Sequence, residues 1–287
     1  MNGNNDRKVA ITVRYHLFRE ETMTLAEQAG FRYVCMGLGE TDVFEHDDWE
    51  KQMARLCADL ERHHLRCSDV HLPVYDLRIS GEKTDPVLDR SMLRCLHAAK
   101  MLGASVCAYH ARSHFVDGLW GNPLDLKASL RDNLTALAPL IEEAEKQNVT
   151  VGVENLPPVP YADHKDDLYA DKPEQLTDMI GGFRSEHICA LWDTGHAHLM
   201  DFDQADAIRS LGGLLRATHI HDNAKNYDAH NPPSMGTTDW PRVMEALRDI
   251  GYQGFLTLES SYYHGAMSEE YVRHLYDCIC RLDDLRH

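Results

Sequence analysis

The sequence lacks any long hydrophobic run. None of its apolar stretches approaches the ~18 residues that a membrane-spanning helix needs, so we expect no membrane partner. Its first ten residues, MNGNNDRKVA, are polar and lack the apolar segment of a secretory signal. Together, these absences lead us to expect a cytoplasmic protein.

Positive charge is also scarce. The 287 residues include 29 lysines and arginines against 46 aspartates and glutamates, which gives a net charge of −17. A surface this negative repels phosphate backbones and anionic membranes, and the cations are scattered along the chain without forming a basic stretch. We therefore expect no nucleic-acid partner.

The eight cysteines show no metal-binding or disulfide pattern. They are dispersed and lie mostly within apolar segments. Cys278 and Cys280 are two residues apart on an expected helix, so their side chains point in different directions. We expect buried free thiols in a reducing compartment.

Short β-rich apolar runs alternate with longer stretches of helical periodicity. Eight such strand–helix units, without a linker or repeat, predict one (β/α)₈ TIM barrel of the α/β class over residues 1–287. An open doubly wound sheet is the alternative, but it normally has a glycine-rich phosphate turn after its first strand, where this chain has RYHLFREE. The expected strands are 8–13, 31–37, 66–72, 105–111, 150–155, 187–193, 216–222 and 254–260.

Histidine, in contrast, is abundant, with 18 residues. Six successive expected strands end in an imidazole or a carboxylate, and in a barrel these strand ends meet at one mouth. A buried carboxylate is costly unless it is paired or bound to a metal. Mixed imidazoles and carboxylates suit Zn²⁺, Mn²⁺ or Co²⁺, so the pattern predicts a divalent metal site. The strand-end residues are His71, His110, Glu154, Asp193 with His196, His219 with His221 and Asp222, and Glu259.

Six segments give the chain a family resemblance from the first expected strand to Ser260. In order and spacing, they resemble the xylose isomerase-like TIM-barrel superfamily, which also includes endonuclease IV. Each segment is weak alone, and the combination is specific. The segments are HLPVYD, YHARSH, VGVENLP, WDTGHAHLMDFD, THIHDNAKNYDAH and LTLES.

In the sugar isomerase and epimerase branch, the resemblance implies one metal with four ligands: Glu154, Asp193, His219 and Glu259. His219 is preferred to His221 because the family pattern places the ligand three residues before the acid, here Asp222. The resemblance also implies that His196 contacts the substrate.

The endonuclease IV branch uses nine ligands for three zinc ions. The five additional positions match residues that this chain has, so the resemblance leaves the number of metals open. For these residues, contacts with substrate or with the primary ligands are the alternative. The additional positions are His71, His110, His196, Asp228 and His230. His114, His198 and His221 are expected to have structural roles.

The predicted function is a metal-dependent sugar isomerase or epimerase. It would act on a small ketose, aldose or keto-polyol through a cis-enediolate, with the metal-bound Glu154 and Glu259 as acid and base. The alternatives are an endonuclease IV-like trinuclear zinc phosphodiesterase and a dehydratase or lyase using the same enolate chemistry. Open coordination positions argue against a metal-storage protein. A homo-oligomer is left open.

The loops expected at the mouth favour a sugar over DNA. PVYDLRISGEKTD, LPPVPYADHKDDLYAD and SSYYHGAMSEE are acidic and aromatic, with few cations to contact phosphates. Flat apolar rings suit the C–H face of a sugar. The aromatic residues expected to serve this purpose are Tyr75, Trp120, Tyr161, Tyr262 and Tyr263.

Overall fold

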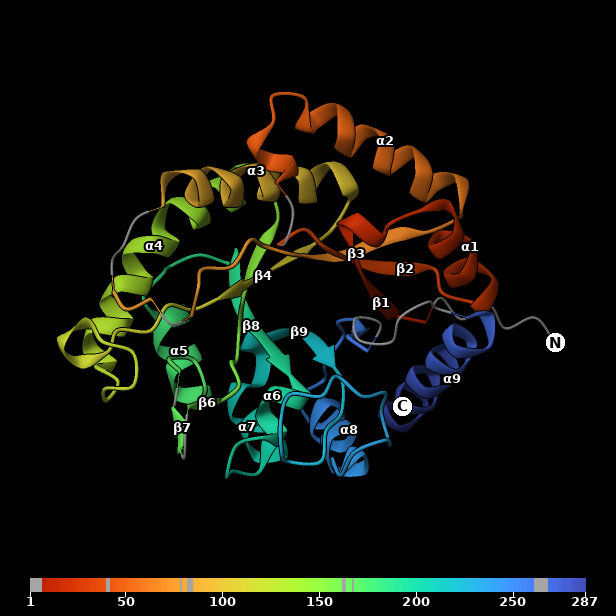
Figure 1. The fold of residues 1–287 in the computed structure, drawn as a ribbon. Helices are drawn as coiled ribbons and strands as arrows, with labels where there is room; N and C mark the ends of the chain where they lie inside the picture. The colour runs from red at the N-terminus through yellow and green to blue at the C-terminus, as the bar shows by residue number, and fades with distance from the viewer. Residues whose placement is uncertain are drawn as a thin grey trace.

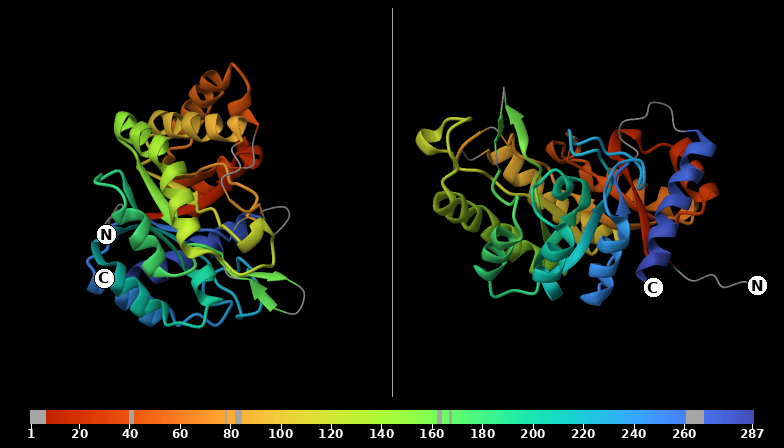
Figure 2. Two further views of the ribbon diagram at one scale, coloured as in Figure 1. Left: turned by 90° about the vertical axis from the view of Figure 1, so that its left-hand side faces the viewer. Right: turned by 90° about the horizontal axis from the view of Figure 1, so that it is seen from below.

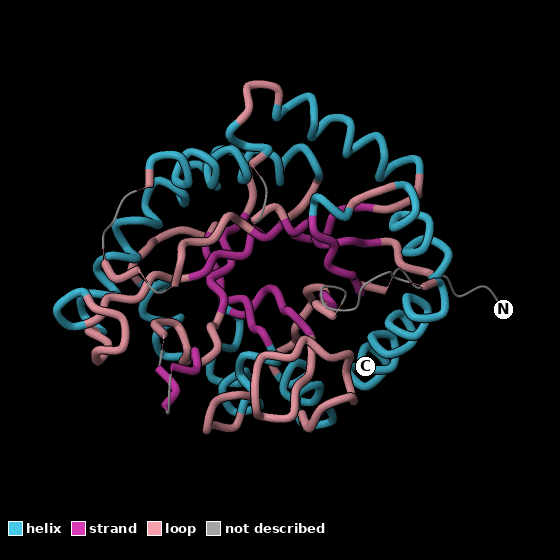
Figure 3. The backbone as a smooth tube through the Cα atoms, viewed as in Figure 1, coloured by secondary structure: helices cyan, strands magenta, loops and turns pink. Residues whose placement is uncertain are grey.

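Eight parallel strands form a closed barrel, as Figure 3 shows in the view down the barrel. The computed structural model describes residues 7–39, 42–77, 79–81, 85–161, 164–166, 168–260 and 268–287. Neighbouring strands follow the order β1-β10-β9-β8-β5-β4-β3-β2, which confirms the predicted (β/α)₈ barrel. The strands are β1 (Val9–Arg14), β2 (Tyr33–Gly37), β3 (Arg66–His71), β4 (Val106–His110), β5 (Thr150–Glu154), β8 (Ile188–Asp193), β9 (Leu215–Ile220) and β10 (Leu256–Leu258).

Helices surround the barrel and cover its outer face (Figure 1). Glycines follow two of the helices: Gly103 and Gly251 have φ of 76° and 68°, a conformation that glycine adopts without strain. The helices are α1 (Glu20–Ala29), α2 (Trp49–Arg62), α3 (Pro86–Leu102), α4 (Leu126–Gln147), α5 (Pro173–Gly181), α6 (Thr194–His198), α7 (Gln204–Leu211), α8 (Trp240–Asp249) and α9 (Glu269–Arg286).

Several short elements lie in the connections. An antiparallel hairpin, β6 (Val159–Tyr161) and β7 (His164–Asp166), follows β5 and projects from the barrel (Figure 2). Its two strands were not predicted as such, because the segment was expected to be a loop. Four 3₁₀ turns complete the described elements: Tyr15–Leu17, Val43–Glu45, Val116–Gly118 and Gly212–Leu214.

The register of the barrel aligns the polar strand ends. His110 at the end of β4 pairs with Glu154 at the end of β5. Asp193 at the end of β8 pairs likewise with His219 of β9. Because adjacent parallel strands hold these residues at one level, their side chains meet at the mouth of the barrel.

The cysteines agree with the sequence-based expectation except that Cys57 and Cys280 are only partly buried. All eight are free, and six of them are buried. Burial raises the pKa of the Cys107 thiol well above its usual value, so this thiol remains protonated and unreactive. Among the described residues, no helix is both long and apolar enough to cross a membrane.

Candidate metal centre

All nine residues of the larger predicted ligand set gather at the mouth of the barrel. Together with His221, they form three groups, two of which share Glu154. Within each group, the possible ligand atoms lie within 4.8 Å of one another. The first group is His71, His110 and Glu154; the central group is Glu154, Asp193, His219 and Glu259; and the outer group is His196, His221, Asp228 and His230.

The central group is built around His219. Its Nδ1 lies 2.9 Å from Glu154 Oε1 and 3.4 Å from Glu259 Oε1. Glu259 Oε1 is buried without a hydrogen bond to any described residue. Three buried carboxylates around one imidazole need a positive charge among them, and oxygen and nitrogen donors of this kind suit a divalent transition metal.

The first group is built around the second carboxylate oxygen of Glu154, which the central histidine does not contact. Its Oε2 lies 3.1 Å from His110 Nε2 and 3.5 Å from His71 Nε2. The two imidazole nitrogens are themselves only 3.1 Å apart. Two facing nitrogen lone pairs repel each other unless a proton or a metal ion lies between them. This group therefore also has the composition and arrangement of a cation site.

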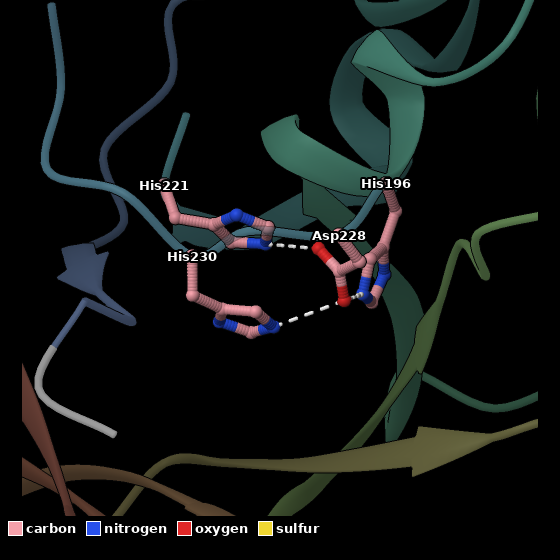
Figure 4. A group of neighbouring side chains, drawn as sticks. All are labelled: His196, His221, Asp228 and His230. Carbon is pink, nitrogen blue, oxygen red and sulfur yellow. Dashed lines mark hydrogen bonds and ion pairs between the residues drawn. The ribbon is translucent and has the colours of Figure 1, made fainter. Parts of the chain in front are cut away.

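The outer group combines His196 of α6, the short helix after β8, with three residues of the segment between β9 and α8 (Figure 4). Asp228 Oδ2 lies 3.0 Å from His230 Nε2 and 3.4 Å from His196 Nε2. His230 has a φ of 45°, a left-handed conformation that costs a non-glycine residue about 1–3 kcal/mol. The fold tolerates this strain where the imidazole faces the Asp228 carboxylate.

Each histidine of the centre has two ring nitrogens, and the contact made by one of them fixes which nitrogen faces the carboxylates. In metal sites, the histidine nitrogen that does not bind the metal usually donates a hydrogen bond, which sets the tautomer. His219 Nε2 faces Asp69 Oδ2 at 3.5 Å, an ion-pair contact without hydrogen-bond geometry. Three other histidines donate Nδ1–H to backbone carbonyls: His71 to Leu72 at 2.9 Å, His196 to Asn155 at 2.8 Å and His230 to Glu259 at 2.8 Å. In these three histidines, Nε2 is the nitrogen directed toward the carboxylates.

The charges in the centre are strongly coupled. Burial opposes ionisation of Glu154, but His219 and His110 hold the pKa of its carboxyl well below the usual value. Burial likewise opposes protonation of His196, but the Asp193 and Asp228 carboxylates raise its pKa well above normal. For His230, Asp228 outweighs burial and raises the pKa to about 9. The carboxylates therefore attract positive charge to the positions proposed for metals.

A cavity of about 260 Å³ opens onto the three groups. This volume lies below the ~300–1,000 Å³ typical of pockets for drug-sized ligands, so it suits a small molecule. Among its described lining residues, Arg14 is the only lysine or arginine, while Val74, Leu77 and Pro157 supply apolar surface. The cavity therefore has little positive charge with which to bind a polyanion.

Of the aromatic residues predicted for the mouth, the two whose side chains the structure describes, Tyr75 and Trp120, do not line this cavity. The prediction for Tyr75 is wrong: its hydroxyl donates to Asp89, and the Arg112 guanidinium lies 3.4 Å from its ring centroid, beside a separate cavity. Trp120 packs edge-on against Phe115 in a cluster of loop residues. Tyr262, Tyr263 and the Tyr161 side chain lie outside the described residues.

One residue of the centre, Asp69, was not predicted from the sequence, and His221 was predicted only as a structural residue. Asp69 lies two positions before His71 on β3 and contacts His219 from within the barrel. His221 lies two positions after His219 and joins the outer group. Side chains at positions i and i+2 of a strand share a face, so the two-residue spacing from His71 and from His219 could have indicated that Asp69 and His221 belong to the centre. His114 and His198 bond instead to Asp132 and Thr237.

Asp222 is a buried carboxylate that supports the loop carrying Asp228 and His230. It accepts five hydrogen bonds, and a Cβ added to Gly236 would lie 2.3 Å from its Oδ1. The bonds come from the backbone N–H groups of Asn223 at 2.9 Å, Ser234 at 3.0 Å and Thr238 at 3.2 Å, from Thr238 Oγ1 at 2.7 Å and from Trp240 Nε1 at 3.0 Å.

We expect Asp222→Ala to destabilise the protein by about 3–5 kcal/mol, because several buried donors would lose their acceptor. Urea unfolding of the metal-free protein would measure this change. The control is Asp239→Ala, since Asp239 is exposed and caps α8 through one bond to Arg242 N, a loss worth about 0.5–2 kcal/mol. Equal destabilisation by the two variants would contradict the supporting role of Asp222.

Comparison with known proteins agrees with this architecture. A family model described as xylose isomerase-like TIM barrel matches residues 23–282. An uncharacterised protein of Methanocaldococcus jannaschii, MJ1311, is 23% identical over 207 residues, covering 71% of this chain and 67% of its own length. A D-psicose 3-epimerase of Enterocloster bolteae is 30% identical over 123 residues, which are 43% of this chain and 37% of the epimerase.

Solved structures show the same fold at low sequence identity. A D-tagatose 3-epimerase-like protein has a TM-score of 0.73 and 18% identity, with 96% of this chain and 97% of that chain covered. The 3-keto-D-glucoside 4-epimerase YcjR of E. coli has a TM-score of 0.71 and 17% identity, with 96% and 100% covered.

Proposed function

The chain belongs to the xylose isomerase-like TIM-barrel family, and from this premise we propose that it is a metal-dependent sugar isomerase or epimerase. The central observation is the placement of two glutamates, Glu154 and Glu259, beside the same nitrogen of His219, Nδ1. Both glutamates also line the small cavity. The epimerases among the similar proteins support the same reaction class.

Glu154, Asp193, His219 and Glu259 would hold the divalent ion, with Zn²⁺, Mn²⁺ and Co²⁺ as candidates. When bound, such an ion supplies the positive charge that stabilises negative charge developing on adjacent sugar oxygens. The buried and unpartnered Glu259 Oε1 is the clearest sign that these residues fit a cation.

The glutamates would perform the proton transfers. One would remove the proton from the carbon beside the sugar carbonyl, and the other would return a proton. Return to the opposite face of the same carbon gives epimerisation, whereas return to the neighbouring carbon gives isomerisation. His196, which also lines the cavity, would hydrogen-bond a sugar oxygen. The apolar side chains of Val74 and Leu77 would pack against C–H groups.

The first and outer groups favour a second candidate, a trinuclear phosphodiesterase. A cation in the first group would engage Glu154 Oε2 while Oε1 faces the central group, so Glu154 would have no oxygen free to act as a base. The net charge of −17 and the presence of only one arginine among the described residues of the cavity lining argue against a DNA substrate. A dehydratase or lyase would share the proton abstraction and differ in its product.

One assay separates these candidates. The metal-reconstituted protein is incubated in D₂O with ketoses, aldoses and keto-inositols, and separately with abasic duplex DNA. We expect deuterium at the carbon beside the carbonyl of at least one sugar, and the product identifies epimerisation, isomerisation or elimination. Cleavage of the duplex without exchange into any sugar would contradict the proposed function and favour the phosphodiesterase.

A further inference from the structure

His221 is a completely buried imidazole for which the proposed reaction has no role. Its ring lies between His230 and the backbone of Gly195. The His221 and His230 rings stack with centroids 3.9 Å apart and planes 7° apart. On the opposite side, a Cβ added to Gly195 would lie 1.9 Å from His221 Cε1. The position of the ring therefore requires glycine at residue 195.

The backbone of His221 is also fixed to the start of α6. Thr194 Oγ1 accepts a hydrogen bond from His221 N at 3.1 Å and donates one to His221 O at 2.9 Å. The Asn223 side chain donates to Gly195 O at 2.8 Å. Because both backbone and ring are constrained, His221 Nε2 is held 2.9 Å from Asp193 Oδ1 and 3.0 Å from Oδ2.

The stacking geometry argues against His221 as a ligand of the outer group. A histidine binds a metal along the lone pair in its ring plane, at about 2.0–2.1 Å. In Figure 4, the nearly parallel rings of His221 and His230 both direct a nitrogen toward Asp228. Two such lone pairs run side by side and do not converge on one ion. His230 and His221 therefore cannot both bind the outer ion in this arrangement.

The second nitrogen of His221 gives an independent argument. His71, His196 and His230 each donate Nδ1–H to a backbone carbonyl. His221 Nδ1 is buried and has no hydrogen bond to any described residue. If Nε2 bound a metal, Nδ1 would carry the proton and be a buried donor without an acceptor, which is costly. In the Nε2–H tautomer, the proton is used in a hydrogen bond to Asp193, and Nδ1 carries only an unpaired acceptor lone pair.

We propose that His221 is a positioning residue that orients Asp193 for the central metal and holds His230 in the outer group. Its Nε2–H donates to the Asp193 carboxylate, and its ring face fixes the plane of His230. This inference rests on the metal dependence of the proposed function. Through its two contacts, His221 links the central and outer groups without binding either ion.

The test compares His221→Phe, which keeps a flat ring but removes the donor, with His221→Gln, which restores an N–H donor on a flexible chain. Zn²⁺ affinity is measured by competition with a chromophoric chelator, and Zn²⁺ content at saturation by elemental analysis. We expect His221→Phe to bind as many ions as the wild type, one of them about 10–100-fold more weakly. His221→Gln should recover part of this affinity. The exposed His274→Phe is the matched control.

Two results would overturn the inference while leaving metal dependence intact. Loss of one Zn²⁺ per chain in His221→Phe would show that His221 is a ligand. An unchanged Zn²⁺ affinity in this variant would show that His221 does not position Asp193. If the wild type bound no divalent metal, the proposed function would fail together with the inference. Failure of sugar exchange in a protein that binds metal would instead affect only the proposed function.

A measurement on the wild-type protein avoids any folding defect of the variants. Two-bond ¹H–¹⁵N correlation spectra of Zn²⁺-loaded protein report the tautomer of each histidine. We expect the Nε2–H tautomer for His221 and the Nδ1–H tautomer for His196 and His230. An Nδ1–H tautomer for His221 in the loaded protein would contradict the proposed hydrogen bond to Asp193.

Discussion

Replacing either Glu154 or Glu259 by glutamine is expected to reduce sugar turnover by about 10²–10⁴-fold while metal remains bound. The amide oxygen of glutamine can still coordinate an ion, but glutamine cannot take or return a proton, and acid–base catalysis contributes about this much to a rate. Both side chains line the cavity and face His219, so each is placed to reach a bound sugar.

Isotope exchange makes this prediction more specific. If the two glutamates act on opposite faces of the sugar carbon, each variant loses epimerisation but keeps exchange for the epimer whose C–H bond faces the remaining glutamate. We therefore expect Glu154→Gln and Glu259→Gln to exchange deuterium into opposite epimers. NMR of the sugars in D₂O measures exchange, and elemental analysis measures metal content.

The control is Glu50→Gln, an exposed substitution on α2, which should behave as the wild type. Wild-type turnover by either cavity variant, with metal bound, would show that the acid–base assignment is wrong. Loss of exchange in both epimers by both variants would argue for one shared step, as in a lyase or an isomerase, rather than for two independent bases.

Asp193→Ala and His219→Ala are expected to abolish activity by a different route, the loss of the central ion. Both side chains are fully buried within the central group, and alanine has no donor to replace them. For the wild type, Zn²⁺ at 100 times its dissociation constant should stabilise the fold by about 2.7 kcal/mol. This corresponds to a rise of about 5–10 °C in Tm. The two variants should show a smaller rise.

Calorimetry with Zn²⁺ and with a chelator separates metal loss from other effects of these substitutions. Asp193 Oδ1 also accepts a hydrogen bond from His196 N at 2.7 Å, capping α6, so Asp193→Ala should lower Tm even in chelator. The exposed Asp277→Ala on α9 is the control. Either variant with the wild-type metal content and Zn²⁺ response would contradict the ligand assignment.

The alternation of apolar and amphipathic segments was sufficient to predict the barrel. Strand and helix periodicity are local properties, and eight such units close in few ways. The polar residues at successive strand ends were likewise visible, because parallel strands in a barrel place their ends at one mouth. The family resemblance, in addition, implied that Glu154, Asp193, His219 and Glu259 form one set of ligands, and the structure brings these four together.

Only the tertiary structure decided how these residues are divided among three groups and which neighbours support them. The spacing of His219 and His221 places both on one face of a strand, but their depth and partners depend on contacts from β5, β8 and the loop before α8. Tyr75 turned away from the cavity because Asp89 and Arg112, on other elements, offer its hydroxyl and ring better contacts. Periodicity determines the face on which a side chain lies, whereas its contacts come from residues distant in the sequence.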